Sequence, residues 1–298
     1  MSSSAISLPV ILVTGANGQL GTAIRAAAVQ YPEFHFLFPG RDVLPVDNEA
    51  VVQAYFKKHH PAFCINCAAY TAVDKAETDR ETAMQVNGLA TGLLAAACKS
   101  FGTKFIHIST DYVFDGTGNV PYKEEDGTHP VNYYGATKLD GEKRCFENNS
   151  GSIVIRTSWV YSEYGSNFVK TMMRLMKEKS SLNVVNDQLG SPTCAVDLAG
   201  VILEIVRTAS QNSSRWVPGI YHFSNDGIIS WYQFAAAIKE FTGSSCEVHP
   251  VPGTMFPTPA KRPAYSGMSK EKIKAVYHIA LADWQISLAS CIKRLQQG

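Results

Sequence analysis

Proton-transfer chemistry is first suggested by a short stretch, NYYGATKLDGEK, at residues 132–143. Tyr134 and Lys138 stand four positions apart, so a helix would place both side chains on one face, whereas Tyr133 and Lys138 are five apart and diverge. An unperturbed phenol has a pKa of about 10, and a neighbouring ammonium lowers it by stabilising the phenolate. Tyr134 and Lys138 are therefore predicted to exchange a proton with a carbonyl oxygen, although this spacing often arises by chance and needs a cofactor site beside it.

A glycine-rich segment upstream is a candidate for that cofactor site. In VILVTGANGQLG, Gly15, Gly18 and Gly21 lie between an apolar run and an alanine-rich segment. A helix that begins here offers free backbone N–H groups and the positive end of its dipole, and glycines let a pyrophosphate approach closely. The strand-before, helix-after context predicts dinucleotide binding, with a purely structural tight turn as the alternative.

The choice of cofactor is read at the end of the second apolar run, in FPGRDV at residues 38–43. Enzymes that use NAD usually place an acid there on the ribose, whereas those that use NADP place an arginine near the 2′-phosphate. Gly40 occupies the acid position and Arg41 follows it, which favours NADPH. NADH stays open, because Asp42 can reach a ribose and Arg41 can be a solvated surface residue.

The elements that must position these residues alternate along the first half of the chain. Apolar runs such as VILVTG, AFCINCAA and KFIHIST are each followed by a helical segment. This rhythm predicts an α/β, Rossmann-like, doubly wound parallel sheet with helices on both faces. We expect residues 1–165 to form the NAD(P)-binding domain. Residues 166–298, where Pro and Gly punctuation is irregular, should form mainly a smaller substrate-binding domain, with segments returning to the first.

Composition argues against several other classes of protein. The 298 residues carry 27 basic and 26 acidic side chains, so no basic surface for nucleic acid is expected. No apolar run is long enough to span a membrane, and the N-terminus has no charged start before an apolar core, so we expect a cytoplasmic protein. The seven cysteines suit reduced thiols, and the CINC pair falls in a predicted strand, where a redox or metal role is disfavoured. No metal-ligand spacing is present, so no metal site is predicted.

Further motifs extend the pattern over nearly the whole chain in a consistent order. These are TGANGQLG, NCAAYTAVDKAE, STDYVFDG, YGATKLDGE, RTSWVY, NDQLGSPT and FPTPAKRP. On them the chain resembles the extended short-chain dehydrogenase/reductases, and among these the dTDP-4-dehydrorhamnose reductase family. The resemblance implies reduction of the 4-keto group of dTDP-6-deoxy-L-lyxo-4-hexulose to give dTDP-L-rhamnose, on a substrate supplied by a 3,5-epimerase.

The resemblance also implies roles for individual residues. Tyr134 would donate the proton, Lys138 would lower the pKa of Tyr134 and hold the nicotinamide ribose, and Thr110 would hydrogen-bond the reacting oxygen. The implied cofactor contacts are Gly15, Asn17, Gly18, Gln19, Leu20, Gly21, Gly40, Arg41, Val46, Asp47, Ala69, Tyr70, Thr71, Tyr134 and Lys138. The implied substrate contacts are Val73, Thr110, Asp111, Trp159, Asn167, Gln188 and Arg262, with a core-packing role as the alternative for Trp159.

Two features set the chain apart from some relatives in this family. Relatives that dimerise around magnesium carry carboxylates near the positions of Ala23 and Val196, so no structural metal is expected here, and a homodimer stays open. The segment LPVDNEAV is also short, which leaves the adenine contacts of Val46 and Asp47 open.

The same superfamily contains other activities. A dehydratase would need a second acid after Asp111, where this chain has Tyr112. A nucleotide-sugar 4-epimerase uses the same Tyr and Lys and stays open. A non-catalytic, NADP-binding regulatory subunit, as found with methionine adenosyltransferase, is disfavoured because Thr110, Tyr134 and Lys138 are all present.

Overall fold

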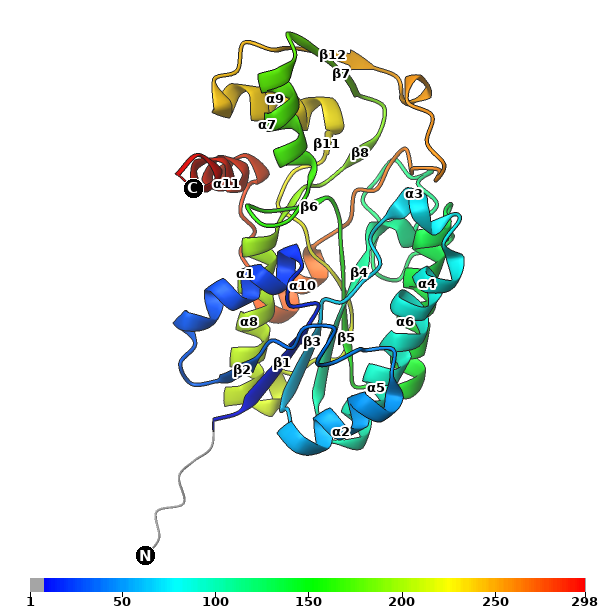
Figure 1. Cartoon of the computed structure of the whole chain (residues 1–298), viewed down its shortest axis with the longest axis vertical. Coiled ribbons are helices and arrows are strands. Elements are labelled where there is room, and N and C mark those ends of the chain that lie inside the picture. Colours follow the sequence, from blue (N-terminus) through cyan, green and yellow to red (C-terminus); the bar gives the residue numbers. More distant parts are fainter. Residues whose placement is uncertain (1–7, 298) are drawn as a thin grey trace, which may run out of the picture.

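A six-stranded parallel sheet forms the centre of the computed structural model, which describes residues 8–297 (Figure 1). Its strands lie in the order β10-β5-β4-β3-β1-β2, and every neighbouring pair is parallel. The bounds are β1 (Val10–Thr14), β2 (His35–Leu37), β3 (Phe63–Asn66), β4 (Lys104–Thr110), β5 (Ile153–Thr157) and β10 (Gly219–His222). The α/β, doubly wound architecture predicted from the sequence is confirmed.

Helices cover both faces of this sheet. Along β1 the side chains alternate, so that Ile11 and Val13 enter one hydrophobic core and Leu12 enters the other. The first core is closed by α1 (Gln19–Ala27), α8 (Ala195–Gln211) and α10 (Glu271–Tyr277). The second core is closed by α2 (Glu49–His59), α5 (Ala90–Ser100) and α6 (Tyr133–Asn148).

A smaller group of elements, with its own hydrophobic core, lies beyond one end of the sheet (Figure 1). It contains α7 (Phe168–Glu178), α9 (Trp231–Thr242) and α11 (Trp284–Gln297), with β7 (Ser181–Val185) paired to β12 (Glu247–Val251). Two short pairs adjoin it: β6 (Val160–Tyr161) with β9 (Thr193–Cys194), and β8 (Leu189–Gly190) with β11 (Ile229–Ser230). Strand β10 belongs to the central sheet, and α8 and α10 pack against it. The chain therefore passes between the sheet and the smaller group more than once. The predicted boundary at residue 165 stays a prediction.

Short helical segments complete the described chain. Near the sheet these are η1 (Ala28–Gln30), α3 (Val73–Ala76), α4 (Arg80–Met84), the π-helical turn η2 (Gln85–Leu89) and η3 (Asp111–Val113). Two more 3₁₀ turns are η4 (Ser213–Arg215) and η5 (Gly253–Met255). Between residues 8 and 297 no helix has the length and apolar character needed to cross a bilayer.

The strand order determines where a ligand can bind. The chain leaves β1 for β2 on one side and returns to β3 on the other, so the loops that follow β1 and β3 diverge. In open α/β sheets this divergence creates a crevice at the carboxyl ends of the strands. Residues 41–47 form turns here and no strand, which places this segment directly at the crevice.

Candidate active site

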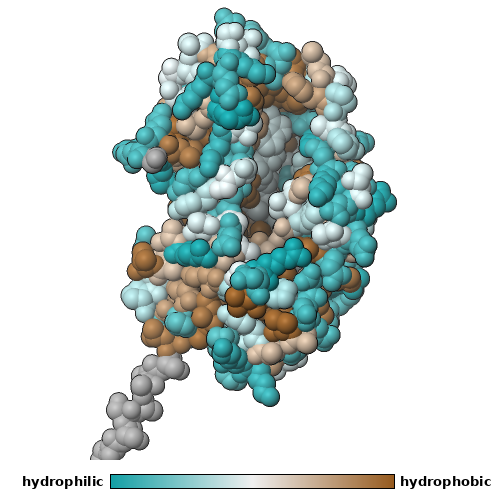
Figure 2. All heavy atoms as spheres, in the orientation of Figure 1, coloured by the Kyte–Doolittle hydropathy of each residue, from teal (hydrophilic) through white to brown (hydrophobic). Residues whose placement is uncertain are grey.

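Two adjoining cavities open at the carboxyl ends of the central strands. The first has a volume of about 480 Å³ and the second about 610 Å³, and Gly18, Cys67 and Ala69 line both. The space-filling view shows a hollow between the sheet and the group of α7 and α9 (Figure 2). The two cavities are therefore adjacent, and small side chains form the wall between them.

The glycine-rich turn between β1 and α1 forms one end of the first cavity. Gly15 has a φ of +62°, and a Cβ there would meet the Cys67 carbonyl oxygen at 2.5 Å, so only glycine fits without strain. Gly18 is the N-cap of α1 and brings no side-chain cap, and the first turn contains no acidic residue. The uncapped N–H groups and close backbone of this turn fit a pyrophosphate.

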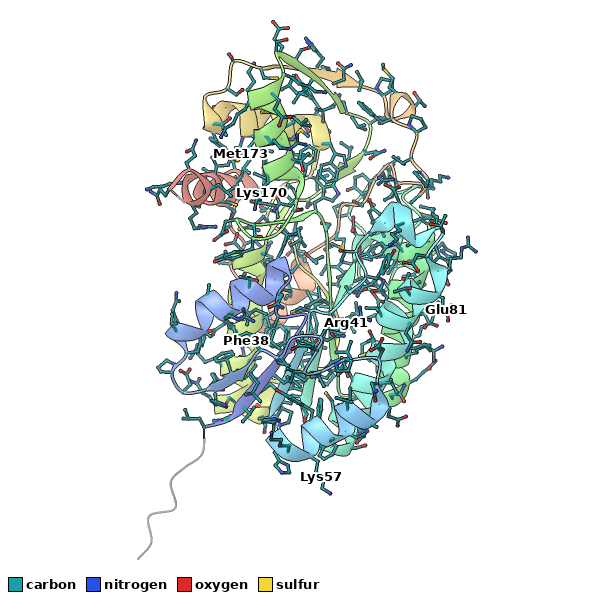
Figure 3. The ribbon with its side chains drawn as sticks, viewed as in Figure 1. Phe38, Arg41, Lys57, Glu81, Lys170 and Met173 are labelled. Atoms are coloured by element: carbon teal, nitrogen blue, oxygen red, sulfur yellow. The ribbon has the colours of Figure 1, made fainter. Side chains whose placement is uncertain are left out.

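The opposite end of the first cavity is lined by the residues that are predicted to determine whether NADPH or NADH binds. Gly40, Arg41, Val46 and Asp47 all line it. The Arg41 side chain is 78% exposed, and its Nη2 lies 3.7 Å from Oδ2 of Asp47. Figure 3 shows Arg41 and Phe38 on the segment that follows β2. Arg41 is thus a cation at the rim of the cavity, restrained only by a weak exposed ion pair.

Among the lining residues of the first cavity that were not predicted as cofactor contacts are Lys75, Asp79, Thr82 and Val86. Asp79 accepts a hydrogen bond from the Tyr70 hydroxyl at 3.0 Å and lies 3.6 Å from Nζ of Lys75. Lys75 lies on α3, Asp79 and Thr82 lie at the N-cap and in the body of α4, and Val86 lies in η2. Lys75 belongs to the NCAAYTAVDKAE motif, and no motif marks Asp79, Thr82 or Val86.

The second cavity brings together the predicted proton-transfer residues. Asn132 caps α6 by accepting from the Gly135 N–H at 2.8 Å, which starts the helix so that Tyr134 and Lys138 face the cavity. Thr110, at the end of β4, lines the same cavity as Tyr134. Burial raises the pKa of Tyr134 to about 12, against the opposing effect of the nearby Thr110 hydroxyl.

Asp111 is the second polar group beside the reacting position. Its Oδ1 accepts from the Thr110 hydroxyl at 3.0 Å. Burial raises its pKa to about 6, although the hydroxyls of Ser266 and Thr110 oppose the shift. Its Oδ2 is buried and makes no hydrogen bond of good geometry among residues 8–297. A buried oxygen in this state is suited to accept a hydrogen bond from a ligand hydroxyl.

Lys138 lines the second cavity, and its ammonium is hydrogen-bonded to β4 at the edge of that cavity. Its Nζ donates to the Ile108 carbonyl at 2.6 Å and lies 3.3 Å from Nε2 of His107. Burial lowers the pKa of Lys138 to about 8. Burial is the largest cause acting on the Tyr134 phenol, and the Lys138 ammonium donates to Ile108, so the pKa of Tyr134 is raised in this structure. That Lys138 lowers the pKa of Tyr134 stays a prediction.

A buried chain of hydrogen bonds fixes the tautomer of His107. The Asn66 side-chain oxygen accepts from the Thr14 hydroxyl at 2.6 Å and from the Ala68 N–H at 3.2 Å. Asn66 therefore turns its NH₂ group to Nδ1 of His107, 3.1 Å away, and that nitrogen must accept. In the neutral imidazole the proton is then on Nε2, which faces Lys138.

Two tryptophans form an aromatic wall of the second cavity. The rings of Trp159 and Trp231 are stacked, with centroids 3.6 Å apart and an interplanar angle of 13°. Trp159 has a φ of +46°, which is unusual for any residue but glycine. Trp231 was not expected at the site from the sequence. The capping signal SWYQ marks a helix start at Ser230 but carries no hint of a binding role.

The other residues implied by the resemblance divide into three sets. Around the first cavity lie Gly15, Asn17, Gly18, Gly40, Arg41, Val46, Asp47, Ala69 and Tyr70. Around the second lie Gln19, Leu20, Gly21, Thr71, Val73, Thr110, Asp111, Tyr134, Lys138, Trp159 and Asn167. Gln188 and Arg262 line neither cavity. Their substrate contacts stay predictions, as do the roles of the lining residues.

Arg262 is engaged with another partner in this structure. Its Nη1 and Nη2 donate to the two carboxylate oxygens of Asp74, each at 2.8 Å, and the Ala260 N–H donates to the same side chain at 3.1 Å. The pKa of Asp74 is lowered, chiefly by Arg262. This pair ties the segment around residue 260 to α3 beside the second cavity. Among the described residues no cluster of three His, Cys, Asp or Glu side chains is arranged to hold a metal.

Comparison with known proteins tests the resemblance. A family model described as the RmlD substrate binding domain matches residues 10–297. A dTDP-4-dehydrorhamnose reductase from Sinorhizobium fredii is 41% identical over 281 residues, which cover 93% of this chain and 94% of the relative. The chain belongs to the dTDP-4-dehydrorhamnose reductase family.

Solved structures of this family share the fold over almost the whole chain. A dTDP-4-dehydrorhamnose reductase from Clostridium acetobutylicum is 39% identical with a TM-score of 0.91, covering 96% of this chain and 99% of the other. A Bacillus anthracis dTDP-4-dehydrorhamnose reductase in complex with NADP is 35% identical with a TM-score of 0.91, covering 97% and 100%. The family membership inferred from the motifs is confirmed.

Proposed function

We propose that this protein uses NADPH to reduce the 4-keto group of dTDP-6-deoxy-L-lyxo-4-hexulose, giving dTDP-L-rhamnose. The observation that carries the proposal is the second cavity, which is lined by Thr110, Tyr134 and Lys138. This cavity adjoins the one formed by the glycine-rich turn and shares lining residues with it. A carbonyl carbon placed against that wall has a cofactor site on one side and a proton donor on the other. Full-length relatives that carry the name of this reductase support the same reaction.

The residues of the first cavity fit a dinucleotide. The glycine turn and the uncapped start of α1 would hold the pyrophosphate, and Arg41 would meet a 2′-phosphate. When bound, NADPH would supply the hydride. We take NADPH as the preferred cofactor because of Arg41 and because a relative was solved with NADP, and NADH remains the alternative.

Tyr134 is proposed as the proton donor in this reduction. Its raised pKa keeps the phenol protonated at neutral pH, which is the form that an acid requires. The alkoxide produced at the sugar oxygen is a stronger base than phenolate, so the proton transfer is downhill. The Thr110 hydroxyl would donate to the same oxygen as negative charge develops, and stabilisation of that charge lowers the barrier.

Lys138 is proposed to hold the nicotinamide ribose and to restore the proton of Tyr134. With a pKa of about 8, its amine is largely charged at neutral pH yet can release a proton. Asp111 and the aromatic wall would orient the sugar, with Asp111 accepting from a sugar hydroxyl through its unsatisfied oxygen.

The cellular setting is also a proposal. All seven cysteines are free thiols, six of them buried, which supports a reducing compartment and thus the cytoplasm. The substrate has the L configuration, so an epimerase acting at carbons 3 and 5 must precede this step. A homodimer is retained as an alternative to a monomer.

The test follows the absorbance of reduced nicotinamide with purified protein, NADPH or NADH, the 4-keto sugar nucleotide and a 3,5-epimerase. Epimerase-dependent oxidation of the cofactor, with dTDP-L-rhamnose as product, is the expected result. Tyr134→Phe should abolish it and the neighbouring Tyr133→Phe should not. Tightly held cofactor without net oxidation would instead indicate the 4-epimerase, and full cellular function in Tyr134→Phe would indicate a regulatory subunit.

A further inference from the structure

Gln19 joins the cofactor turn to the far wall of the second cavity. It is the first residue of α1, so its backbone stands at the uncapped helix N-terminus beside Gly18. Its side chain points the other way. The side-chain oxygen accepts from the Ser162 hydroxyl and from the Asn167 amide, each at 2.9 Å, and its nitrogen donates to the Val160 carbonyl at 3.2 Å.

These partners belong to one compact segment, residues 158–167, which we call the wall segment. Asn167 caps α7 by accepting from the Lys170 N–H at 3.1 Å, and its amide also donates to the Ser162 carbonyl at 2.7 Å. The helix that starts at this cap carries Lys170 and Met173 in Figure 3. Gly165, with a φ of +61°, lies against the Gln19 side chain. The wall segment is therefore held together internally and tied to the start of α1 through Gln19.

The wall segment carries the strained residue of the site. Trp159, at a φ of +46°, directly precedes Val160, whose carbonyl accepts from Gln19. A non-glycine residue persists in the left-handed region only where its surroundings hold it. On one side Trp159 is stacked on Trp231, and a Cβ at Gly190 would come within 2.8 Å of its ring, so the space behind it is full. On the other side, the Gln19 side-chain amide holds the carbonyl of Val160, the residue that follows Trp159.

We propose that Gln19 is a positioning residue, which uses its side chain to hold Trp159 in the orientation that the sugar nucleotide meets. The inference rests on the proposed function, since it takes the second cavity as the sugar site. Gln19 would then serve both ligands: its backbone N–H faces the pyrophosphate, and its side chain sets the sugar wall. Binding at the glycine turn and the shape of the wall are coupled through this one residue.

The test compares Gln19→Met with Gln30→Met. Methionine keeps the length of glutamine and its backbone N–H but cannot make the three side-chain contacts. Gln30 is exposed at the end of η1 and provides the same substitution away from the cavities. The kinetic readout is KM against kcat, and the spectroscopic readout is the paired circular dichroism band that two stacked indoles produce. Trp159→Phe removes that band and identifies it.

The expected result for Gln19→Met is a rise in KM for the sugar nucleotide of about tenfold, from the loss of the hydrogen bonds that fix the wall. The dissociation constant of NADPH should change by less than about threefold, since hydride donor binding uses the backbone. The paired band should weaken in Gln19→Met and not in Gln30→Met. Ser162→Ala should shift KM and the band in the same direction by less.

An unchanged band and an unchanged KM in Gln19→Met would overturn the proposal. If Gln19→Met does not fold, Ser162→Ala decides between the same two outcomes, because it removes one contact and leaves the volume of Gln19 in place. A parent protein that oxidises neither cofactor would refute the proposed function, while the band would still report whether Gln19 holds Trp159.

Discussion

The Nε2 atom of His107 lies 3.3 Å from Nζ of Lys138, and the hydrogen bonds of Asn66 put the imidazole proton on that nitrogen. A charged ammonium cannot accept this N–H, whereas an uncharged amine can. The geometry thus disfavours the charged lysine, in the same direction as burial, which lowers its pKa to about 8. Glu142 and Cys67 act in the opposite direction.

The pH dependence of turnover follows from this arrangement. Tyr134 stays protonated well above neutrality, so the first group to lose a needed proton as pH rises is Lys138. We expect kcat to fall as pH increases through about 8. Any residual activity of Lys138→Arg should lack this limb, because guanidinium keeps its charge. A flat kcat profile in the parent protein between neutral and strongly alkaline pH would contradict the role given to Lys138.

The buried carboxylate of Asp111 should lower the stability of the fold at neutral pH while it helps to bind the sugar. Its pKa is raised to about 6 in the folded protein, so the folded state binds this proton more tightly than the unfolded state. The associated stability is present below the unfolded pKa of about 4 and is lost as pH rises through about 6. At neutral pH, Asp111→Asn should stabilise the fold by on the order of 2 kcal/mol in denaturant unfolding and weaken sugar binding.

The control for that experiment is Asp115→Asn. The pKa of Asp115 is lowered, mainly by the Thr117 N–H, so its stability contribution has the opposite sign. This variant should be no more stable than the parent at neutral pH. Equal destabilisation by both substitutions would show that burial of the Asp111 carboxylate does not cost the folded protein stability at neutral pH.

Arg41 should decide between the two cofactors. Removal of a charged partner from a phosphate costs about 1.5–3 kcal/mol, so Arg41→Ala should raise the KM for NADPH by about tenfold or more. The KM for NADH should hardly change, because NADH has no 2′-phosphate. Lys57→Ala, at an exposed position on α2, is the matched control. Equal losses with NADPH and NADH would assign Arg41 a structural role.

The glycines of α6 should be irreplaceable for steric reasons. A Cβ at Gly141 would collide with the Asn87 carbonyl, so Gly141→Ala should destabilise the protein by about 1–3 kcal/mol. Gly200, within α8, has open space at the same position, and Gly200→Ala should stabilise by about 0.5–1 kcal/mol. Thermal unfolding measures both. Similar shifts for the two variants would mean that close packing of α6 is unimportant.

The sequence predicted the elements that have strong local signals. Alternating apolar runs and helices gave the parallel sheet, and the turn at Gly15 gave the cofactor cavity, because both follow from backbone rules that act over a few residues. The spacing of Tyr134 and Lys138 placed both side chains in one cavity, where they lie.

The sequence could not predict how far burial outweighs neighbouring charge. Burial raises the pKa of Tyr134, and the extent of that burial depends on how distant segments pack around it. Lys138 donates to a carbonyl group that is in place only once the sheet has folded. Trp231 and Thr82 line the cavities only because distant segments come together in the folded chain. Arg262 was expected to contact the substrate, but in this structure it is paired with Asp74, 188 positions away.

The wall shared by the two cavities has a consequence for how the protein can change. Gly18, Cys67 and Ala69 present nothing larger than a thiol between the two ligand sites. Hydride transfer requires the donor and acceptor carbons to approach almost to contact, so any larger side chain here would hold them apart. Substitutions elsewhere in each cavity can adapt it to a new nucleotide or a new sugar. At these three positions, by contrast, nearly every substitution introduces a larger side chain and should abolish the reaction.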